Sequence, residues 1–236
     1  MAIKIFIDQG HNPGNINAGA QGFGMREEDI TYNVGRYLAD ILNNDSRFEA
    51  RLSRNSPTEV LGTSNTTSLA ARVNAANSWP ANYFLSIHVN ANVNPDINGS
   101  EVYVYQEYSQ SYYMGEQILD AMVNVVGTKD NGLRIRPSLY VLRKTSMPAA
   151  LIELAYITNA SNAEKLRNDQ YLFARSIYIG LLNYFGTSSE ELLEQGAERA
   201  KQFYLPQIEE LIAKVNQLTS ELEEIKKNSP QNNSAY

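Results

Sequence analysis

Short apolar runs alternate with helix-length amphipathic segments throughout residues 1–186, and this alternation limits the fold more than any other feature. Strands that alternate with helices predict an α/β fold, in which a mostly parallel, twisted sheet is flanked by helices. The strand candidates are Ile3–Asp8, Phe48–Ser53, Tyr83–Ile87, Glu101–Tyr105, Leu139–Leu142 and Ala149–Leu154, and the helix candidates are Glu27–Leu42, Leu69–Trp79, Tyr112–Val126 and Ala163–Tyr184.

The overall composition is that of a soluble globular protein, with 43% apolar and 19% charged residues. No apolar run reaches roughly 18 residues, so we expect no membrane-spanning helix. A net charge of −6 without any cluster of Lys and Arg argues against a nucleic-acid partner. The absence of cysteine excludes disulfides, thiolate zinc sites and a cysteine nucleophile.

The composition changes after Gly186. Ser188 and Glu191 form a capping box, which predicts the start of a helix. Further along, apolar residues recur at alternating spacings of three and four, which is the a/d pattern of a coiled coil. The residues of this seam are Ile208, Leu211, Val215, Leu218, Leu222 and Ile225.

In this register Glu221 occupies position g and Lys226 the following position e, a pairing that favours a parallel partner helix. We therefore predict a helical, coiled-coil-like tail over residues 187–227 that forms a homodimer. The alternative is an amphipathic helix that docks on its own domain, because the seam spans fewer than three heptads. Ser, Pro, Gln and Asn dominate residues 228–236, which we expect to be disordered.

The chain contains only two histidines, and each follows a strand candidate. His11 comes after Ile3–Asp8, and His88 comes after Tyr83–Ile87. Ligands of open α/β sheets bind beyond the carboxyl ends of the strands, so we expect both imidazoles at the same edge. Because histidine is the commonest protein metal ligand, the two side chains predict a metal site there.

A catalytic zinc site with two imidazoles needs a carboxylate and an open position. The glycine-rich loop Asn12–Gly24 leads into a helix whose first turn carries Glu27, Glu28 and Asp29. Acidic residues are common in a first turn because they complement the helix dipole, so the residues alone leave the choice among these three open. Glu153, at the end of the last strand candidate, reaches the same edge of the sheet.

Five blocks of the sequence carry a likeness to a known family of enzymes. They are Ile7–Gly14, Gly24–Thr31, Leu85–Ala91, Leu139–Arg143 and Pro148–Asn159. In this order, and over about residues 1–186, the blocks resemble the zinc-dependent N-acetylmuramoyl-L-alanine amidases. That family cleaves the amide bond between the lactyl group of N-acetylmuramic acid and the L-alanine of the stem peptide in bacterial cell walls. The resemblance implies the same reaction on peptidoglycan, carried out by residues 1–186.

Matched position by position, the resemblance implies that His11, Glu27 and His88 hold one zinc ion per chain. Glu153 matches the catalytic glutamate of the family. It would act as general base towards water whose pKa the zinc lowers to about 7. Alternatively, Glu153 is a carboxylate that ends a strand at the surface, but a glutamate among aliphatic residues is seldom buried without a role or a partner.

Four further side chains belong to the same blocks or to a neighbouring helix. Asn90, two residues after His88, either orients that ligand or contacts the substrate. Arg143 either lies at the rim of the substrate groove or is a solvated surface residue. Arg72 and Asn77 match a helix of the family, and we expect Arg72 to pair with a carboxylate for structural reasons. The substrate-binding candidates are therefore Asn90 and Arg143.

Two other functions fit parts of this pattern. Two histidines and a carboxylate also form the facial triad of non-haem iron oxygenases. That chemistry has no need of the general-base glutamate that the amidase blocks supply. The second alternative is a non-catalytic module for cell-wall binding or assembly, although all four positions of the site carry suitable residues.

The first residues bear on where such an enzyme would work. Met1–Lys4 leads directly into a strand candidate, without the basic and apolar regions of a signal peptide. We therefore expect synthesis in the cytoplasm and action on the cell wall after release. Phage-type endolysins and autolysins freed by lysis of a mother cell work in this way.

Overall fold

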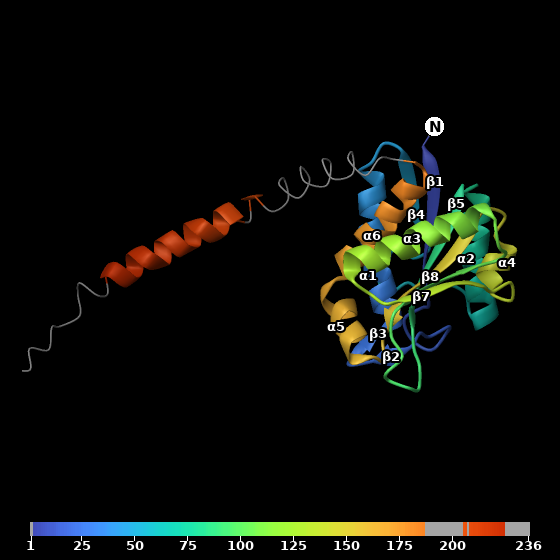
Figure 1. Ribbon diagram of the computed structural model, residues 1–236, viewed down its shortest axis with the longest axis horizontal. Helices are drawn as coiled ribbons and strands as arrows, with labels where there is room; N and C mark the ends of the chain where they lie inside the picture. Colours follow the sequence, from blue (N-terminus) through green and yellow to red (C-terminus); the bar gives the residue numbers. More distant parts are fainter. Residues whose placement is uncertain (1, 187–204, 207, 225–236) are drawn as a thin grey trace, which may run out of the picture. The chain divides into compact units, whose positions relative to one another are not determined.

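The computed structural model describes residues 2–186, 205–206 and 208–224 (Figure 1). The chain divides into two compact units, Met1–Gly186 and Thr187–Tyr236. The boundary coincides with the change of composition in the sequence. Within the described ranges, no helix has both the length and the apolar character that crossing a membrane requires.

The first unit is built on a six-stranded sheet with the strand order β4-β1-β5-β8-β6-β7. The first four of these strands are parallel, β6 is antiparallel to β8, and β7 is parallel to β6. The predicted α/β fold with a mostly parallel sheet is thus confirmed. The strands are β1 Ile3–Gln9, β4 Phe48–Leu52, β5 Tyr83–Asn90, β6 Ser100–Val104, β7 Asp130–Ile135 and β8 Ala149–Tyr156, and a separate hairpin pairs β2 Gln21–Gly22 with β3 Met25–Arg26.

Helices cover both faces of this sheet (Figure 1). On one face α6 packs against both α1 and α3, and on the other face α2 packs against α4. Successive residues of a strand point to opposite faces, so β1 directs Phe6 towards α2, where it joins Trp79 and Phe84 in one core. The helices are α1 Glu27–Asn43, α2 Asn65–Ser78, α3 Gln110–Val126, α4 Tyr140–Lys144, α5 Ala160–Asn168 and α6 Gln170–Tyr184.

The predicted strand over Leu139–Leu142 is wrong, because these residues lead into and form part of helix α4. Val141 and Leu142 are buried in the core beside α2. A run of four apolar residues fits a buried helical turn as well as a short buried strand, so the pattern alone did not distinguish them.

The single helix predicted over Ala163–Tyr184 is also wrong. It is two helices, α5 and α6, which meet at Asp169. The backbone of Asp169, at φ −114° and ψ 25°, departs from helical geometry. Asn168 and Asp169 have low helix propensity, which explains why the chain turns at this point.

Sequence analysis missed β7 and placed the start of α2 too late. β7 is an edge strand that contains Asp130 and Gly132 and is only partly buried, so it lacks an apolar run. α2 begins at Asn65, four residues before the predicted Leu69. Its start is fixed by a capping box between Ser64 and the residue three positions further on, which stabilises a polar first turn.

In the second unit, residues 205–206 and 208–224 are helical. The seam residues described there each expose at least half of their surface; they are Ile208, Leu211, Val215, Leu218 and Leu222. Other parts of the predicted tail lie outside the described residues: the capping box at Ser188 and Glu191, the seam residue Ile225, Lys226 and residues 228–236. Those features, and the pairing of the seam with a partner, stay predictions.

Candidate metal centre

Three side chains from different elements converge at the carboxyl ends of β1 and β5. His11 follows β1, Glu27 opens α1, and His88 lies near the end of β5. Oε1 of Glu27 is 3.2 Å from Nε2 of His11 and 3.0 Å from Nδ1 of His88. One potential ligand atom from each residue lies within 4.8 Å of the other two. The three residues predicted as metal ligands are therefore placed so that they could hold one ion.

Backbone groups hold two of these ligands in position. The carbonyl oxygen of Asn17 lies 3.1 Å from Nδ1 of His11, so that nitrogen can donate its proton and leave Nε2 for a metal. The carboxylate of Glu27 accepts hydrogen bonds from the backbone amides of Ala20 and Val89, at 2.8 and 2.9 Å. These contacts preorganise the cluster, because they orient the ligands through the protein itself.

Two glycines make the close packing around the cluster possible. A Cβ atom on Gly10 would lie 2.6 Å from Cε1 of His88, and one on Gly19 would lie 2.8 Å from Cβ of Glu27. Between them, His11 has a φ of 65°, a left-handed conformation that few residues other than glycine adopt. The backbone at Gly10 and at Gly19 therefore lies against the ligands, where a larger residue would not fit.

The structure also separates Glu27 from its acidic neighbours. Glu28 is buried, but its Oε1 lies 3.5 Å from Nε of Arg26. Asp29 accepts two hydrogen bonds from Arg26, both at 2.8 Å. Of the three acids in the first turn, only Glu27 belongs to the group that could hold a metal.

Glu153 lies beside the cluster, on the strand next to His88. The two residues are directly paired across β5 and β8, so their side chains share one face of the sheet. Oε2 of Glu153 is buried and has no hydrogen-bond partner among the described residues. A buried carboxyl oxygen without a partner is unusual in folded proteins, and this one belongs to the residue paired with the candidate ligand His88.

The surroundings push the pKa values of the two carboxyl groups in opposite directions. Burial, followed by the charges of Glu27 and Glu101, raises the pKa of Glu153 well above its ordinary value. Burial opposes the ionisation of Glu27 as well, but hydrogen bonds with His11 and His88 outweigh it and hold the pKa of Glu27 low. A pair of carboxyl groups separated in this way can divide ligand and acid–base roles.

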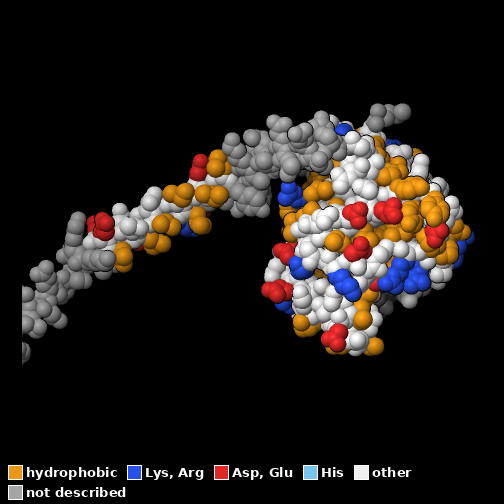
Figure 2. Space-filling view, viewed as in Figure 1, with side chains coloured by type: hydrophobic (Ala, Val, Ile, Leu, Met, Phe, Trp, Pro, Cys, Tyr) orange, Lys and Arg blue, Asp and Glu red, His pale blue; other side chains and the backbone are white. Residues whose placement is uncertain are grey.

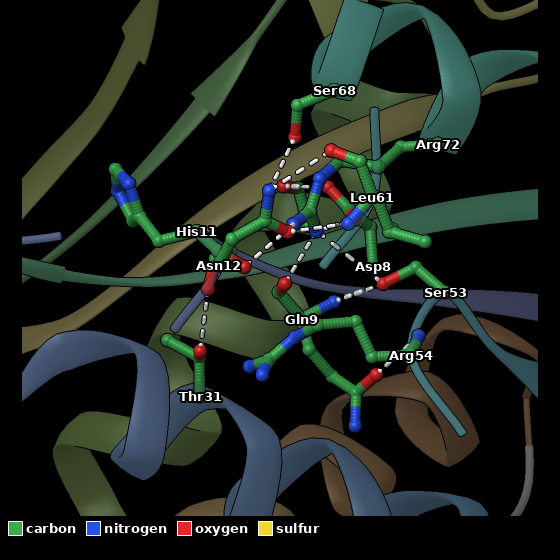
Figure 3. Close-up of polar contacts among 12 residues, drawn as sticks. Asp8, Gln9, His11, Asn12, Thr31, Ser53, Arg54, Leu61, Ser68 and Arg72 are labelled. Carbon is green, nitrogen blue, oxygen red and sulfur yellow. Dashed lines mark hydrogen bonds and ion pairs between the residues drawn. The ribbon is translucent and has the colours of Figure 1, made fainter. Parts of the chain in front are cut away.

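The guanidinium of Arg72 supports the loop that carries His11 (Figure 3). Its Nη1 donates to Oδ1 of Asp8 at 2.7 Å and to the carbonyl of Gln9 at 2.5 Å. Its Nη2 donates to the carbonyl of His11 at 2.5 Å and to Oδ1 of Asn12 at 2.9 Å. The imidazole of His11 points away from this network (Figure 3), and the predicted structural ion pair of Arg72 is confirmed.

The remaining predicted residues lie outside the cluster. Oδ1 of Asn90 accepts a hydrogen bond from the backbone amide of Ala91 at 2.8 Å. Arg143 lies on α4 before the start of β8, and its Nη1 donates to the carbonyl of Ser138. The amide of Asn77 donates to the carbonyl of Lys144, the last residue of α4, and accepts from the backbone amide of Ser146. The roles of Asn90 and Arg143 towards a substrate stay predictions.

Sequence analysis missed Glu101, which is 2% exposed and directly paired with Glu153 across β6 and β8. The signal was present, because Glu101 opens a strand candidate that is otherwise apolar and aromatic. A buried glutamate requires donors, and Tyr156 supplies one at 2.6 Å. Glu101 and Glu153 are 52 residues apart in the sequence, and their pairing depends on the antiparallel direction of β6, which no local sequence pattern predicts.

An α/β unit with a His-Glu-His cluster at the edge of its sheet, and beside it a partly buried glutamate with one enclosed carboxyl oxygen, has the elements of a metal-dependent hydrolase. Residues 5–183 match the model of the N-acetylmuramoyl-L-alanine amidase family. The chain therefore belongs to that family, as its sequence blocks predicted.

Individual relatives agree with this assignment. The chain is 37% identical to the amidase LytC of Bacillus subtilis over 77% of its own length and 35% of that protein. It is 36% identical to the amidase CwlM of Bacillus licheniformis, over 79% of this chain and 70% of the relative. The catalytic domain of the amidase CwlV from Bacillus (Paenibacillus) polymyxa has a similar structure, with a TM-score of 0.69, 27% identity, and coverage of 79% of this chain and 99% of the domain. The chain thus spans about a third of LytC and nearly all of a solved catalytic domain.

Proposed function

We propose that this chain is a zinc-dependent amidase that hydrolyses the bond between N-acetylmuramic acid and L-alanine in peptidoglycan. The observation that carries the proposal is the convergence of His11, Glu27 and His88 beside Glu153, whose buried Oε2 has no partner among the described residues. Membership of the amidase family supports the choice of substrate.

The donor set supports zinc as the metal. Two imidazoles and one carboxylate are the protein ligands of many catalytic zinc sites. When bound, zinc acts as a Lewis acid that polarises the scissile carbonyl and makes water nucleophilic near neutral pH. His11, Glu27 and His88 would hold the ion, and the hydrogen bonds from the backbone amides of Ala20 and Val89 keep Glu27 in place for it.

Glu153 is the proton carrier in this proposal. Its buried Oε2 is available to accept a proton from the attacking water. A new C–O bond forms at the lactyl carbonyl carbon and the C–N bond to L-alanine breaks. Glu153 then gives its proton to the departing nitrogen. The carboxyl group thus carries one proton from the water to that nitrogen and returns to its ionised form.

Digestion of purified peptidoglycan tests the proposal. The full chain, stripped of metal and reloaded with zinc, should release stem peptides that carry a new free amino group on L-alanine and leave the glycan strands intact. Glu153→Gln should lower the rate by about 10²–10⁴-fold, the usual range for a general base. It should still bind one zinc ion, while Glu164→Gln, on an exposed position of α5, should behave like the original chain.

Three outcomes would contradict the assignment. The first is peptidoglycan digestion without new L-alanine amino groups, which would indicate another bond. The second is an unchanged rate in the Glu153→Gln variant, which would remove the proposed proton carrier. The third is a purified protein with stoichiometric iron and no zinc, because a histidine and carboxylate triad also binds iron in oxygenases.

We further propose that the tail helix pairs with a second copy of the chain. In the described part of the helix, β-branched Ile208 and Val215 occupy a positions, while Leu211 and Leu218 occupy d positions. This combination favours two-stranded parallel coiled coils. All four side chains expose at least half of their surface in the second unit, which leaves them available to a partner.

Sedimentation equilibrium tests this pairing on the full chain. The original chain should give a dimer, and the double substitution Leu211→Asp and Leu218→Asp should give a monomer. Glu210→Gln, on the opposite side of the same helix, serves as control and should remain dimeric. The same mass for the original chain and the double variant would refute pairing through the seam.

We also propose that the enzyme reaches the cell wall after release from the cytoplasm, as phage-type endolysins and autolysins freed by lysis of a mother cell do. Fractionation of producing cells before and after lysis tests this. Amidase activity should stay with the cytoplasmic fraction until lysis. Activity in the medium of intact cells would contradict it.

A further inference from the structure

Beyond Glu153, a row of polar side chains crosses the antiparallel end of the sheet. Glu101 on β6 is directly paired with Glu153 on β8. Tyr103 on β6 is in turn paired with Arg134 on β7. Opposed residues of neighbouring strands share one face of the sheet, and Glu153 shares that face with His88. The row therefore leads from the candidate proton carrier towards Arg134, on the side of the metal cluster.

Glu101 is a buried carboxylate that fixes this row. Oε1 of Glu101 accepts a hydrogen bond from the hydroxyl of Tyr156 at 2.6 Å, and Oε2 accepts one from the hydroxyl of Tyr103. Nη2 of Arg134 lies 3.4 Å from Oε1 of Glu101. Two hydroxyl donors and one ion pair thus hold the Glu101 carboxylate, and the carboxylate orients the guanidinium beside it.

Arg134 keeps donors for another partner. Its side chain is 46% exposed, and its contacts to Glu101 and to the carbonyl of Asn131 both use Nη2. Within the described part of the chain, Nε and Nη1 therefore have no protein acceptor. The guanidinium of Arg136 lies 5.6 Å from the ring of Tyr103, which adds a second positive charge nearby. In Figure 2, Lys and Arg side chains gather over the region where Figure 1 labels β7.

We propose that Arg134 binds a carboxylate on the peptide arm of the substrate, close to L-alanine, and this inference rests on the proposed amidase function. Neighbouring strands are about 4.8 Å apart. β6 lies between β7 and β8, and Arg134 contacts Glu101, the residue paired with Glu153, so its guanidinium lies within about two strand spacings of Glu153. One extended residue spans about 3.5 Å. L-alanine and the next residue together span about 7 Å, so a peptide that crosses the row from the scissile amide would bring the carboxylate of that second residue within reach of Arg134.

The chemistry of that residue makes the inference specific. In stem peptides the residue after L-alanine is glutamic acid with a free carboxylate, or the same residue with that carboxylate amidated. The planar guanidinium of Arg134, with two donors left open, matches a carboxylate and is a poorer match for a neutral amide. Arg134 would then make the enzyme prefer the free acid.

If Arg134 served only to neutralise the charge of Glu101, its side chain would be expected to be buried as well, but it is 46% exposed. The structural ion pair between Arg72 and Asp8 in the same unit is enclosed, with both side chains 1% exposed. In the pair between Arg134 and Glu101, the acid is equally enclosed, but nearly half of the arginine side chain faces solvent. The Arg134 side chain thus contacts a buried carboxylate and is also exposed to solvent.

A matched pair of soluble substrates tests the inference. They are muramoyl tripeptides that differ only at the second residue, D-glutamic acid in one and its amide, D-isoglutamine, in the other. With the zinc-loaded full chain, we expect kcat/KM to be about 10- to 100-fold higher for the acid, as for one charged hydrogen bond. Arg134→Gln should bring the ratio of the two kcat/KM values close to one, and Arg134→Lys should restore part of it.

Arg36→Gln is the matched control, because Arg36 is 44% exposed and pairs with Asp40 on α1. It should keep the ratio of the original chain. Equal kcat/KM values for acid and amide in the original chain would overturn the inference and leave the amidase function intact. Loss of both rates by the same factor in Arg134→Gln would overturn it too, since that result assigns Arg134 to support of Glu101. Cleavage of neither substrate would instead refute the proposed function.

Discussion

Replacing Arg72 with methionine would remove a guanidinium that several buried acceptors share. Methionine keeps much of the apolar stem and deletes every hydrogen-bond donor. Of the donors to the Asp8 carboxylate in the described part of the chain, the hydroxyl of Ser86, at 2.7 Å, would then remain. The carbonyls of Gln9 and His11 would lose the bonds that Arg72 donates to them. The substitution therefore affects both the fold and the loop that presents a metal ligand.

The structure supports a large effect on stability. Arg72 and Asp8 are each 1% exposed, so the charge of Asp8 would remain buried without its partner. Removing one member of a buried ion pair typically costs about 3–5 kcal/mol in free energy of unfolding. The total free energy of unfolding of a globular domain is about 5–15 kcal/mol, so the variant would lose a large share of its stability.

Urea unfolding of the full chain at a fixed zinc concentration measures this loss. Arg36→Gln provides the control, because its ion pair with Asp40 is exposed and should contribute less than about 1 kcal/mol. The double substitution Asp8→Asn and Arg72→Met should recover part of the loss, since it removes the unpaired charge. Zinc affinity, measured by competition with a chelator, should fall in Arg72→Met and stay unchanged in Arg36→Gln.

A loss below about 1 kcal/mol for Arg72→Met would refute this reasoning, because it is within the range of an exposed pair. A double variant no more stable than Arg72→Met would also contradict it. In that case the missing hydrogen bonds to the loop, and not the unpaired charge of Asp8, would account for the effect.

Three further predictions address individual residues of the site. Glu27→Gln should abolish stoichiometric zinc binding, whereas Glu28→Gln should keep it; equal affinities would contradict the ligand assignment. Gly10→Ala should weaken zinc binding by about tenfold or more, because its Cβ would displace His88, and an unchanged dissociation constant would refute this. Burial raises the pKa of Asp8, but the charge and hydrogen bond of Arg72 outweigh burial and hold that pKa below its usual 3.8. The ion pair therefore contributes its full share to the free energy of unfolding above pH 3.8, and this share is lost as the pH falls through the lowered pKa. Asp8→Asn should therefore flatten the acid side of the stability profile, and an unaltered profile would contradict the assignment.

The buried parallel strands could be predicted because they are apolar on both faces, and therefore appear as continuous apolar runs. This applies to β1, β5 and β8, which place His11, His88 and Glu153 at one edge of the sheet. The positions of these three site residues thus followed from local sequence and from the general rule for ligands in α/β sheets. The resemblance of the sequence blocks to the amidase family then predicted which reaction this site carries out.

The choice between Glu27 and Glu28 could not be made from the helical pattern. Adjacent residues of a helix point about 100° apart, and which of them faces the cluster depends on how the helix enters the fold. In the structure, the entry is fixed by the backbone amide of Ala20 and by the close approach of Gly19 to Glu27. Both contacts come from the loop before the helix, which has no periodic pattern to interpret.

The polar row of Glu101, Tyr103 and Arg134 could not be predicted, because it depends on pairings between distant segments. β7 lacks an apolar run, so its neighbour β6 had no predicted partner on that side. The antiparallel direction of β6 also escaped prediction. Without that direction, Glu101 cannot be placed opposite Glu153.

The strand order explains why the metal cluster forms where it does. From β1 the chain passes through α1 to β4 on one side, and it returns through α2 to β5 on the other side of β1. Right-handed crossovers in opposite directions place their helices on opposite faces, so a crevice opens between β1 and β5 at their carboxyl ends. His11 leaves β1 at this crevice and His88 reaches it on β5, while α1 begins there with Glu27. The ligands are far apart in sequence and close in space because the topology reverses between these two strands. It follows that substitutions on β6 and β7 which preserve this reversal should leave the three candidate ligands in place, and the zinc affinity of such variants would measure this.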